Sequence, residues 1–380
     1  MPDPDTASIM LAGDVMTGRR LNDYLLTLAD PAAIWGEALA VWQDHLNYRR
    51  VVNLETAITT EAEAFPHKRF HFRMHPDNLH TLVSAGIDVC TVANNHIMDA
   101  GARGLTDTLE QIQQAGIATS GAGADASLAA APTATRLADG RRLLVFAWAH
   151  PSSFTPRGWA AGAATPGVNL LPDYSIRTLA KVARHIRREK GPDDIVLAAI
   201  HWGPNWGYRV NVKQRWFARR LVDMAGVDLI QGHSSHHPMA IEVYRGRPII
   251  YGCGDLINDY YVCGDLRNDD RHDPMACYRP ELAPLYFIDL GANGRLKQLR
   301  VSVMRMTAFC LERASEADAR WLCRTLNQGG TTDQEEPVGR YPYLARRTFN
   351  TRWIPAGGEK IRIATTRRDN SVTQDGVDLT

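Results

Sequence analysis

The sequence predicts an α/β fold whose mixed, largely buried β-structure is flanked by helices. Six short apolar segments each end in a metal-competent or small polar residue, helical patterns lie between them, and a hairpin pattern follows late in the chain. Strands that alternate with helices in this way are typical of βαβ units. The chain has 380 residues, enough to bury a substantial core.

Each apolar segment is a predicted strand that delivers polar side chains to the carboxyl edge of a sheet. The segments are residues 9–12 before Gly13-Asp14, 50–53 before Leu54-Glu55, 89–93 before Asn94-Asn95-His96, 195–200 before His201, 227–231 before Gly232-His233, and 248–251 before Gly252-Cys253-Gly254-Asp255. Divalent metals are held by carboxylate, amide and imidazole groups that converge from separate elements. These strand ends are therefore candidate metal ligands.

The remaining elements complete a single catalytic domain with a tail. Alternation over residues 282–305 with a turn at 291–294 predicts a hairpin, which we expect to close a second sheet. Ser315 can cap a helix that runs to about Gln328. The predicted helices are 104–115, 176–189 and 214–224, and the predicted loops are 118–131 and 152–172. We expect a catalytic domain 1–305, a helix and extension 306–364 packed on it, and a disordered tail 365–380.

Composition excludes several classes of function. The formal net charge is +1, which gives no global attraction for nucleic acid or an anionic membrane. No stretch approaches the roughly 18 apolar residues of a membrane span, and residues 1–8 are too short and acidic for a signal peptide, so we expect a cytoplasmic protein. The six cysteines are scattered and predict reduced thiols. The oligomeric state is left open.

Each candidate ligand has a plain structural alternative when it is taken alone. Asp14 could be a turn residue, Asn95 a helix cap and His201 a satisfied core histidine. The segment 231–238 is the most specific, because three imidazoles within five residues beside a strand end are costly to bury unless they share a cation. A surface histidine cluster is the alternative for that segment. Together the six segments favour a metal site.

The same residues resemble a known family. Gly13-Asp14-Val15-Met16, Asn53-Leu54-Glu55-Thr56, Ala93-Asn94-Asn95-His96 with Asp99, His201-Trp202-Gly203, Gly232-His233 and Tyr251-Gly252-Cys253-Gly254-Asp255 resemble, in order and spacing, the CapA family. That family is named for poly-γ-glutamate capsule synthesis and belongs to the calcineurin-like metallophosphoesterase superfamily. The resemblance covers about residues 9–305 and implies an αββα sandwich of two mixed sheets flanked by helices.

The resemblance also implies roles for individual residues. One or two divalent ions, with Mn, Zn or Ca the most plausible, would be held by Asp14, Glu55, Asn95, His201, His233 and His236. His96 would be the general acid or base, with Asp99 holding its other ring nitrogen. The superfamily has a histidine where this chain has Met16, so we expect the first metal to bind weakly and one ion to suffice. This departure counts against two-metal phosphoester hydrolysis.

Three functions follow from these features, and a non-catalytic binding protein with a relic site is a fourth possibility. We favour a metal-dependent acid/base enzyme acting on a peptide or amino-acid derivative, as in a lasso-precursor Cα epimerase of this family. The alternatives are a metallophosphoesterase or hydrolase and a poly-γ-glutamate biosynthesis protein. In an epimerase, Asp255 or His237 would face His96 across the substrate.

Two further segments are candidates for substrate contact. Trp202, Trp206 and Tyr208 could wall a pocket for a bulky side chain, with core packing as the alternative. The polar segment 259–279 could be a substrate-binding insertion or a surface loop.

Overall fold

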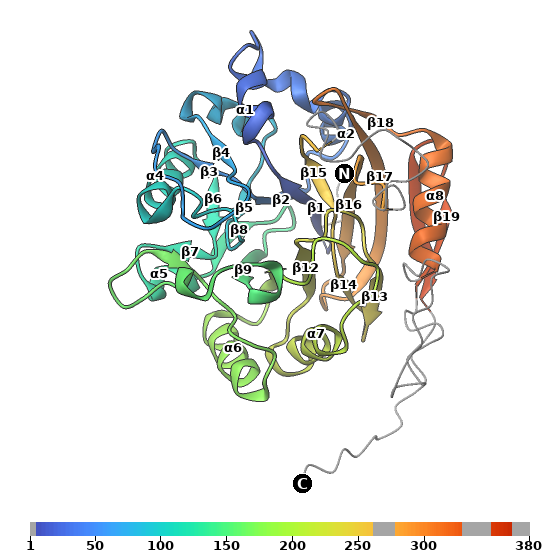
Figure 1. Cartoon of the computed structure of the whole chain (residues 1–380). Helices are drawn as coiled ribbons and strands as arrows, with labels where there is room; N and C mark the ends of the chain where they lie inside the picture. Colours follow the sequence, from blue (N-terminus) through green and yellow to red (C-terminus); the bar gives the residue numbers. More distant parts are fainter. Residues whose placement is uncertain (1–4, 261–277, 329–350, 367–380) are drawn as a thin grey trace, which may run out of the picture.

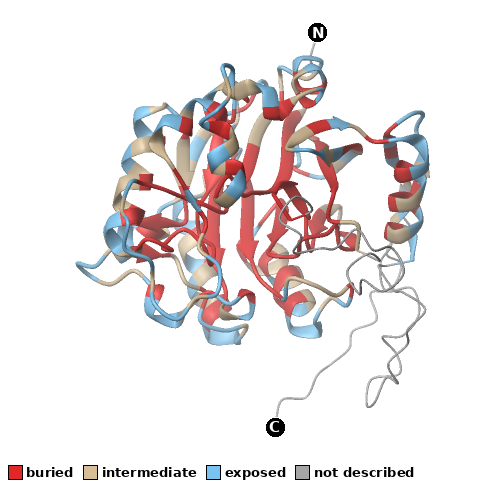
Figure 2. Ribbon diagram, turned by 45° about the horizontal axis from the view of Figure 1, so that its top comes forward, coloured by how far each residue is buried: buried red, intermediate tan, exposed pale blue. Residues whose placement is uncertain are grey.

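Two β-sheets lie face to face, and helices cover the outer face of each (Figure 1). The computed structural model describes residues 5–260, 278–328 and 351–366. The predicted αββα sandwich is confirmed, because one apolar core fills the space between the sheets and two others lie under the helices on either side. Figure 2 shows the buried residues running through the middle of the molecule along the strands.

The first sheet is mixed and has β1 near its centre. Its main order is β19-β20-β17-β16-β1-β2-β5-β6, with β15 also paired to β1 and β18 to β17. β1 runs parallel to β2 and β15 and antiparallel to β16. The strands are β1 (Ala7–Val15), β2 (Arg49–Leu54), β5 (Val89–Thr91), β6 (Ala118–Ser120), β15 (Asp255–Ile257), β16 (Leu282–Leu290), β17 (Leu296–Thr307), β18 (Cys310–Arg313), β19 (Thr351–Pro355) and β20 (Lys360–Thr366).

The second sheet has the order β13-β14-β12-β11-β9-β8. Its four central strands are parallel, and an antiparallel strand closes each edge. The strands are β8 (Thr133–Arg136), β9 (Arg142–Ala149), β11 (Ile195–His201), β12 (Leu229–His233), β13 (Ile241–Tyr244) and β14 (Arg247–Ile250). Two short pairs lie outside the sheets, β3 (Ala57–Ile58) with β4 (Arg73–Met74) and β7 (Ala122–Gly123) with β10 (Gly167–Val168).

Most helices cover the outer face of one of the two sheets, and α8 lies at a sheet edge. The early helices pack on the outer face of the first sheet, and α6 and α7 pack on the outer face of the second. α8 lies against β19 and β20 at the far edge of the first sheet (Figure 1). The α-helices are α1 (Arg19–Leu25), α2 (Ala38–Gln43), α3 (His80–Ser84), α4 (Gly101–Gln114), α5 (Ala126–Ala130), α6 (Ile176–Glu189), α7 (Val212–Ala225) and α8 (Glu316–Asn327); 3₁₀ turns are η1 (Pro31–Trp35), η2 (Pro76–Leu79), η3 (Pro151–Ser153) and η4 (Arg157–Trp159).

Most predicted elements are present, and three expectations need correction. The late hairpin is β16–β17, but it pairs with β1 in the first sheet rather than closing the second, whose edge is closed by the β13–β14 hairpin. The predicted loop 118–131 contains β6, β7 and α5. Asp125 begins α5 by accepting a hydrogen bond from the amide of Leu128. β20 extends to Thr366, so the first residues of the predicted tail are in a strand.

The remaining predictions are either confirmed or concern residues that the structure does not describe. Helices α4, α6 and α7 match the predicted ones, and Ser315 caps α8 in a reciprocal capping box with Asp318. Residues 261–277, most of the predicted insertion, and residues 367–380 of the predicted tail lie outside the described residues. Within the described ranges, no helix has the length and apolar character needed to cross a membrane.

Two glycines let the strands that carry polar side chains approach closely. A Cβ on Gly13 would lie 1.7 Å from the carbonyl oxygen of Gly254, and one on Gly232 would lie 2.1 Å from that of Tyr251. Both distances are impossible for real atoms, so only glycine fits at these positions. Because β1 can then pair with β15, Asp14 stands directly beside Asp255.

Candidate metal centre

Asp14 is the most completely buried acid of the site and is held from three directions. Its Oδ1 accepts a hydrogen bond from Asn53 Nδ2 at 2.9 Å and its Oδ2 accepts from the backbone amide of Ser234 at 3.2 Å. His233 Nδ1 lies 2.8 Å from Asp14 Oδ1. Burial alone would raise the pKa of Asp14, but the contact with the His233 imidazole outweighs it and lowers the pKa below its usual value.

Four buried side chains converge on one point. Candidate ligand atoms of Asp14, Glu55, His236 and Asp255 all lie within 4.8 Å of one another. Burial and the negative charges of Asp14 and Asp255 raise the pKa of Glu55 well above its usual value. Burial also raises the pKa of Asp255 to about 6, although His236 opposes the rise. Three carboxylates this close cannot all be ionised without a cation among them, so the donor set fits a divalent metal ion.

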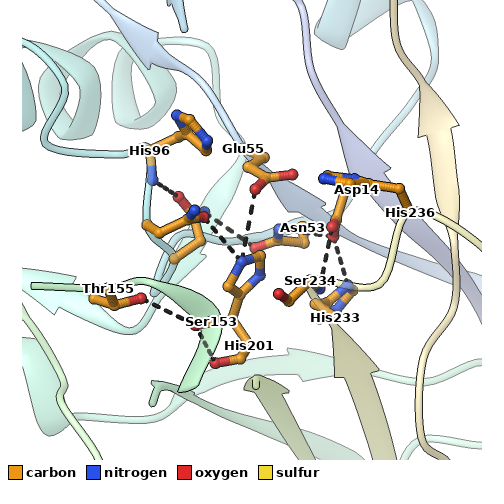
Figure 3. Close-up of polar contacts among 12 residues, drawn as sticks. Asp14, Asn53, Glu55, His96, Ser153, Thr155, His201, His233, Ser234 and His236 are labelled. Carbon is orange, nitrogen blue, oxygen red and sulfur yellow. Dashed lines mark hydrogen bonds and ion pairs between the residues drawn. The ribbon is translucent and has the colours of Figure 1, made fainter. Parts of the chain in front are cut away.

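Unpaired lone pairs beside this cluster also fit a metal ion. His201 Nδ1, His233 Nε2 and Glu55 Oε2 are buried and make no hydrogen bond within the described part of the chain. The other ring nitrogen of His201, Nε2, lies 3.0 Å from Asn95 Oδ1 and 3.6 Å from Glu55 Oε1. Buried polar atoms without partners are costly, and a bound cation would satisfy them. Figure 3 shows these side chains meeting from the ends of strands in both sheets.

His96 and Asp99 form a second unit at the end of β5. His96 Nδ1 lies 2.6 Å from Asp99 Oδ2, and the ring stacks on Phe72 with centroids 3.8 Å apart. Asn94 Oδ1 accepts hydrogen bonds from the backbone amides of His96 and Ile97, which fixes this turn. Burial lowers the pKa of His96 to about 4 despite the opposing effect of Asp99. His96 is therefore neutral at pH 7 and can accept a proton.

The turn after β12 separates the roles of two adjacent histidines. Ser234 has a left-handed backbone, with φ of 87°. His236 Nδ1 lies 3.1 Å from Asp255 Oδ1, and although burial alone would lower the pKa of His236, Asp255 raises it. The ring of His237 instead stacks on Tyr278 at 4.6 Å, its Nδ1 faces the carbonyl of Pro238, and burial lowers its pKa to about 3.

The two candidates for a group opposite His96 have different surroundings. Asp255 belongs to the acidic cluster and is paired with His236. His237 lies in an aromatic cluster with Tyr208 and Tyr278, and among the described residues it forms no ion pair with a carboxylate. The spacing of the two histidines in the sequence could not reveal this, because they lie in an irregular turn that includes a left-handed non-glycine residue, Ser234.

The predicted aromatic wall divides into two parts. Trp206 is partly exposed and its ring lies 5.4 Å from that of His236, while Tyr208 packs on His237. Trp202 is only 1% exposed, and its indole nitrogen donates to the carbonyl of Tyr251 at 3.0 Å. Trp202 is therefore a packing residue, which corrects its assignment as a substrate contact.

Met16 fills the place where the family resemblance leads one to expect a histidine. Its side chain is buried and packs with Phe72 and Tyr260. Phe72 stacks on His96 and Tyr260 lies against His236, so the thioether sits between the two units of the site. A thioether is a poor ligand for hard divalent ions, and this position contributes packing rather than an imidazole.

Several residues of the site escaped the sequence analysis. Asn53 and Ser234 hold Asp14, and Lys68 reaches Asp99 from a loop between β3 and β4. Asn53 lies at a strand end and could have been found from the pattern of apolar runs, whereas Lys68 could not. Lys68 comes from an irregular segment whose contacts depend on the tertiary fold.

Comparisons with known proteins give one consistent result. The profile of a family described as "Bacterial capsule synthesis protein PGA_cap" matches residues 8–260. A "Probable polyglutamine synthesis accessory protein" of Mycobacterium tuberculosis is 38% identical over 358 residues, which cover 86% of this chain and 92% of that protein. The "PGA biosynthesis protein CapA" of Bacillus subtilis is 29% identical, covering 67% of this chain and 64% of that protein.

Among solved structures, a 5'-nucleotidase precursor from Thermus thermophilus is similar to this chain with 15% sequence identity and a TM-score of 0.46. The similarity covers 85% of this chain and 59% of that one.

Proposed function

Since this chain belongs to the PGA_cap family of bacterial capsule synthesis proteins, we propose that it is a metal-dependent enzyme that hydrolyses an amide bond in a γ-linked glutamate polymer. The observation that carries the proposal is the convergence of Asp14, Glu55, His236 and Asp255 on one buried point. We place the activity in residues 1–305, because all of the convergent side chains lie there. The substrate class is taken from the relatives, whose names refer to capsule and polymer synthesis.

The metal would be held by residues of both sheets. Asp14, Glu55, His236 and Asp255 supply the first set of donors, and Asn95, His201 and His233 supply neutral donors next to it. When bound, a divalent ion supplies a Lewis acid for the carbonyl and a water of lowered pKa. This set of oxygen and nitrogen donors is compatible with Mn or Zn, and the carboxylates alone would also suit Ca.

His96 would move the proton that amide cleavage requires. Its Nδ1 is engaged with Asp99, so its Nε2 is the nitrogen that can serve the reacting group. A neutral imidazole can accept a proton from the attacking water and then deliver it to the departing amine. Asp99 would keep the ring in the tautomer that this task needs.

Peptide Cα epimerisation is a second candidate, favoured by one observation. Figure 3 shows His96 and His236 on opposite sides of Glu55, and inversion at Cα needs proton-transferring groups on two faces. No relative among those compared carries a name that refers to epimerisation, so this reading ranks behind hydrolysis. Phosphoester hydrolysis ranks third, because Met16 replaces an imidazole in the site.

One experiment separates the three reactions. A γ-linked glutamate oligomer is incubated with the protein and Mn²⁺ or Zn²⁺ in deuterated water and followed by mass spectrometry. Hydrolysis gives shorter chains with new amino groups, whereas epimerisation leaves the length unchanged and adds about one mass unit at each inverted centre. Neither change, combined with rapid cleavage of a simple phosphodiester, would refute the proposal and restore the phosphoesterase. His96→Gln serves as the inactive control.

A further inference from the structure

We propose that Lys68 is a positioning residue that fixes Asp99 and thereby holds the His96 ring in its working orientation. The inference rests on the proposed role of His96 in proton transfer. Lys68 lies in residues 65–72, the second half of the segment that joins the short strands β3 and β4, and Phe72 of this part stacks on His96.

The side chain of Lys68 is buried to an unusual degree for a lysine. It is 15% exposed, and its ammonium group donates to the Asp99 carboxylate and to the backbone carbonyl of Asn95. The ammonium nitrogen also lies 3.2 Å from His96 Nδ1 and 5.0 Å from the centre of the Trp159 ring. Because lysine is almost never buried unless it is paired, these contacts are what keep the charge in this place.

The donors around Asp99 determine where the proton of His96 lies. Asp99 Oδ1 accepts from Lys68, while Oδ2 accepts from the backbone amide of Phe72 at 2.6 Å and faces His96 Nδ1 at 2.6 Å. An ionised carboxylate only accepts and an ammonium only donates, so the proton between Oδ2 and His96 belongs to Nδ1. Nε2 then carries the lone pair.

Lys68 holds the carboxylate in the plane that this hydrogen bond requires. Without Lys68, Oδ1 of Asp99 would have no donor among the described residues, and the carboxylate could turn about its last side-chain bond. The backbone amide of Phe65 also donates to the Asp99 carbonyl at 2.7 Å, so both ends of the segment 65–72 are tied to Asp99. Lys68 anchors the middle of that segment.

The same ammonium group also connects His96 to the candidate metal centre. Its second acceptor is the carbonyl of Asn95, whose side-chain Oδ1 lies 3.0 Å from His201 Nε2. One cation therefore holds the residues on both sides of His96. The next residue, Arg69, is exposed and its guanidinium stacks over Phe70 with 5.0 Å to the ring centre, which makes it a matched control.

The test observes the hydrogen-bonded Nδ1 proton of His96 directly. Protein labelled with ¹⁵N-histidine and loaded with Zn²⁺, which is diamagnetic, is studied by NMR, and the resonance is assigned by its loss in His96→Gln. We expect a protected Nδ1 proton in the wild type, in Arg69→Met and in Lys68→Arg, which keeps a charged donor. In Lys68→Met its exchange with solvent should rise by about tenfold or more, because the acceptor is no longer fixed.

Controls separate positioning from folding and from the reaction. Metal content and the unfolding temperature are measured for each variant, and Lys68→Gln replaces Lys68→Met if the latter does not fold. A neutral variant that folds and keeps the wild-type exchange rate would overturn the inference. If the exchange rate rises as expected but no variant or wild type cleaves a glutamate oligomer, the positioning role stands and the proposed function falls. In an active protein, Lys68→Met should lower kcat with little change in KM.

Discussion

Replacing His233 with alanine should remove most of the stability that a divalent ion gives this protein. His233 is 1% exposed at the end of β12, its Nδ1 lies 2.8 Å from Asp14 Oδ1, and its Nε2 has no hydrogen-bond partner among the described residues. We propose that an imidazole in this position is a metal ligand rather than a packing group, because its second nitrogen is buried without a partner among the described residues. Alanine preserves the strand and removes the donor.

The expected shift can be estimated from ligand linkage. An ion at 100 times its dissociation constant stabilises the native state by about 2.7 kcal/mol. Unfolding entropy is about 2.1 cal/mol/K per residue, so a chain of 380 residues should gain roughly 3 °C in Tm. If loss of one imidazole weakens binding about 100-fold, the same ion concentration gives only about 0.4 kcal/mol and a shift below about 1 °C.

Calorimetry with and without Zn²⁺ measures this difference. The ion concentration is set at 100 times the wild-type dissociation constant, which titration calorimetry provides. His80→Ala, at an exposed histidine of α3, is the matched control and should keep the full shift. An equal shift in His233→Ala and the wild type would refute the assignment of His233 as a ligand.

Three other perturbations test different parts of the molecule. His96→Gln should retain stoichiometric metal by elemental analysis while the reaction rate falls by about 10²- to 10⁴-fold; full activity would return His96 to a structural role. His150 follows β9, caps η3 and is buried, and burial lowers its pKa to about 4. The unfolded chain therefore takes up this proton first as the pH falls, and stability should be lost between about pH 6.5 and 4. The loss should be less steep in His150→Gln, as urea unfolding at several pH values would show. Gly13→Ala should destabilise the fold by about 1–3 kcal/mol or more and weaken metal binding, because its Cβ would push β15 away from Asp14; unchanged urea unfolding and metal affinity would contradict this close approach.

The sequence predicted the residues that the sheets bring together, for a simple physical reason. Parallel strands end at one edge, and the polar residue after each apolar run is carried there whatever the intervening loops do. Asp14 and Asp255 show this most directly, since strand pairing places them side by side. The layers followed from the same apolar runs, whereas the partner of the late hairpin did not, because alternation and a turn identify a hairpin but not the strand with which it pairs.

The sequence could not predict contacts that depend on backbone direction within a turn. His236 meets Asp255 and His237 meets Tyr278 although the two histidines are adjacent, and the turn that carries them contains Ser234 with a positive φ. Trp202 likewise follows His201 directly but points into the core. Lys68 shows a second limit, because an irregular segment with no periodicity gives no indication of which side chain it will bury.

Anomalous diffraction from crystals soaked in Mn²⁺ tests the central claim most directly. The claim is that the strand ends of both sheets form one divalent metal site. We predict an anomalous peak within about 2.0–2.6 Å of carboxylate oxygens of Asp14, Glu55 or Asp255 and of a nitrogen of His236. At a saturating Mn²⁺ concentration, the absence of a peak at these four side chains would contradict the account.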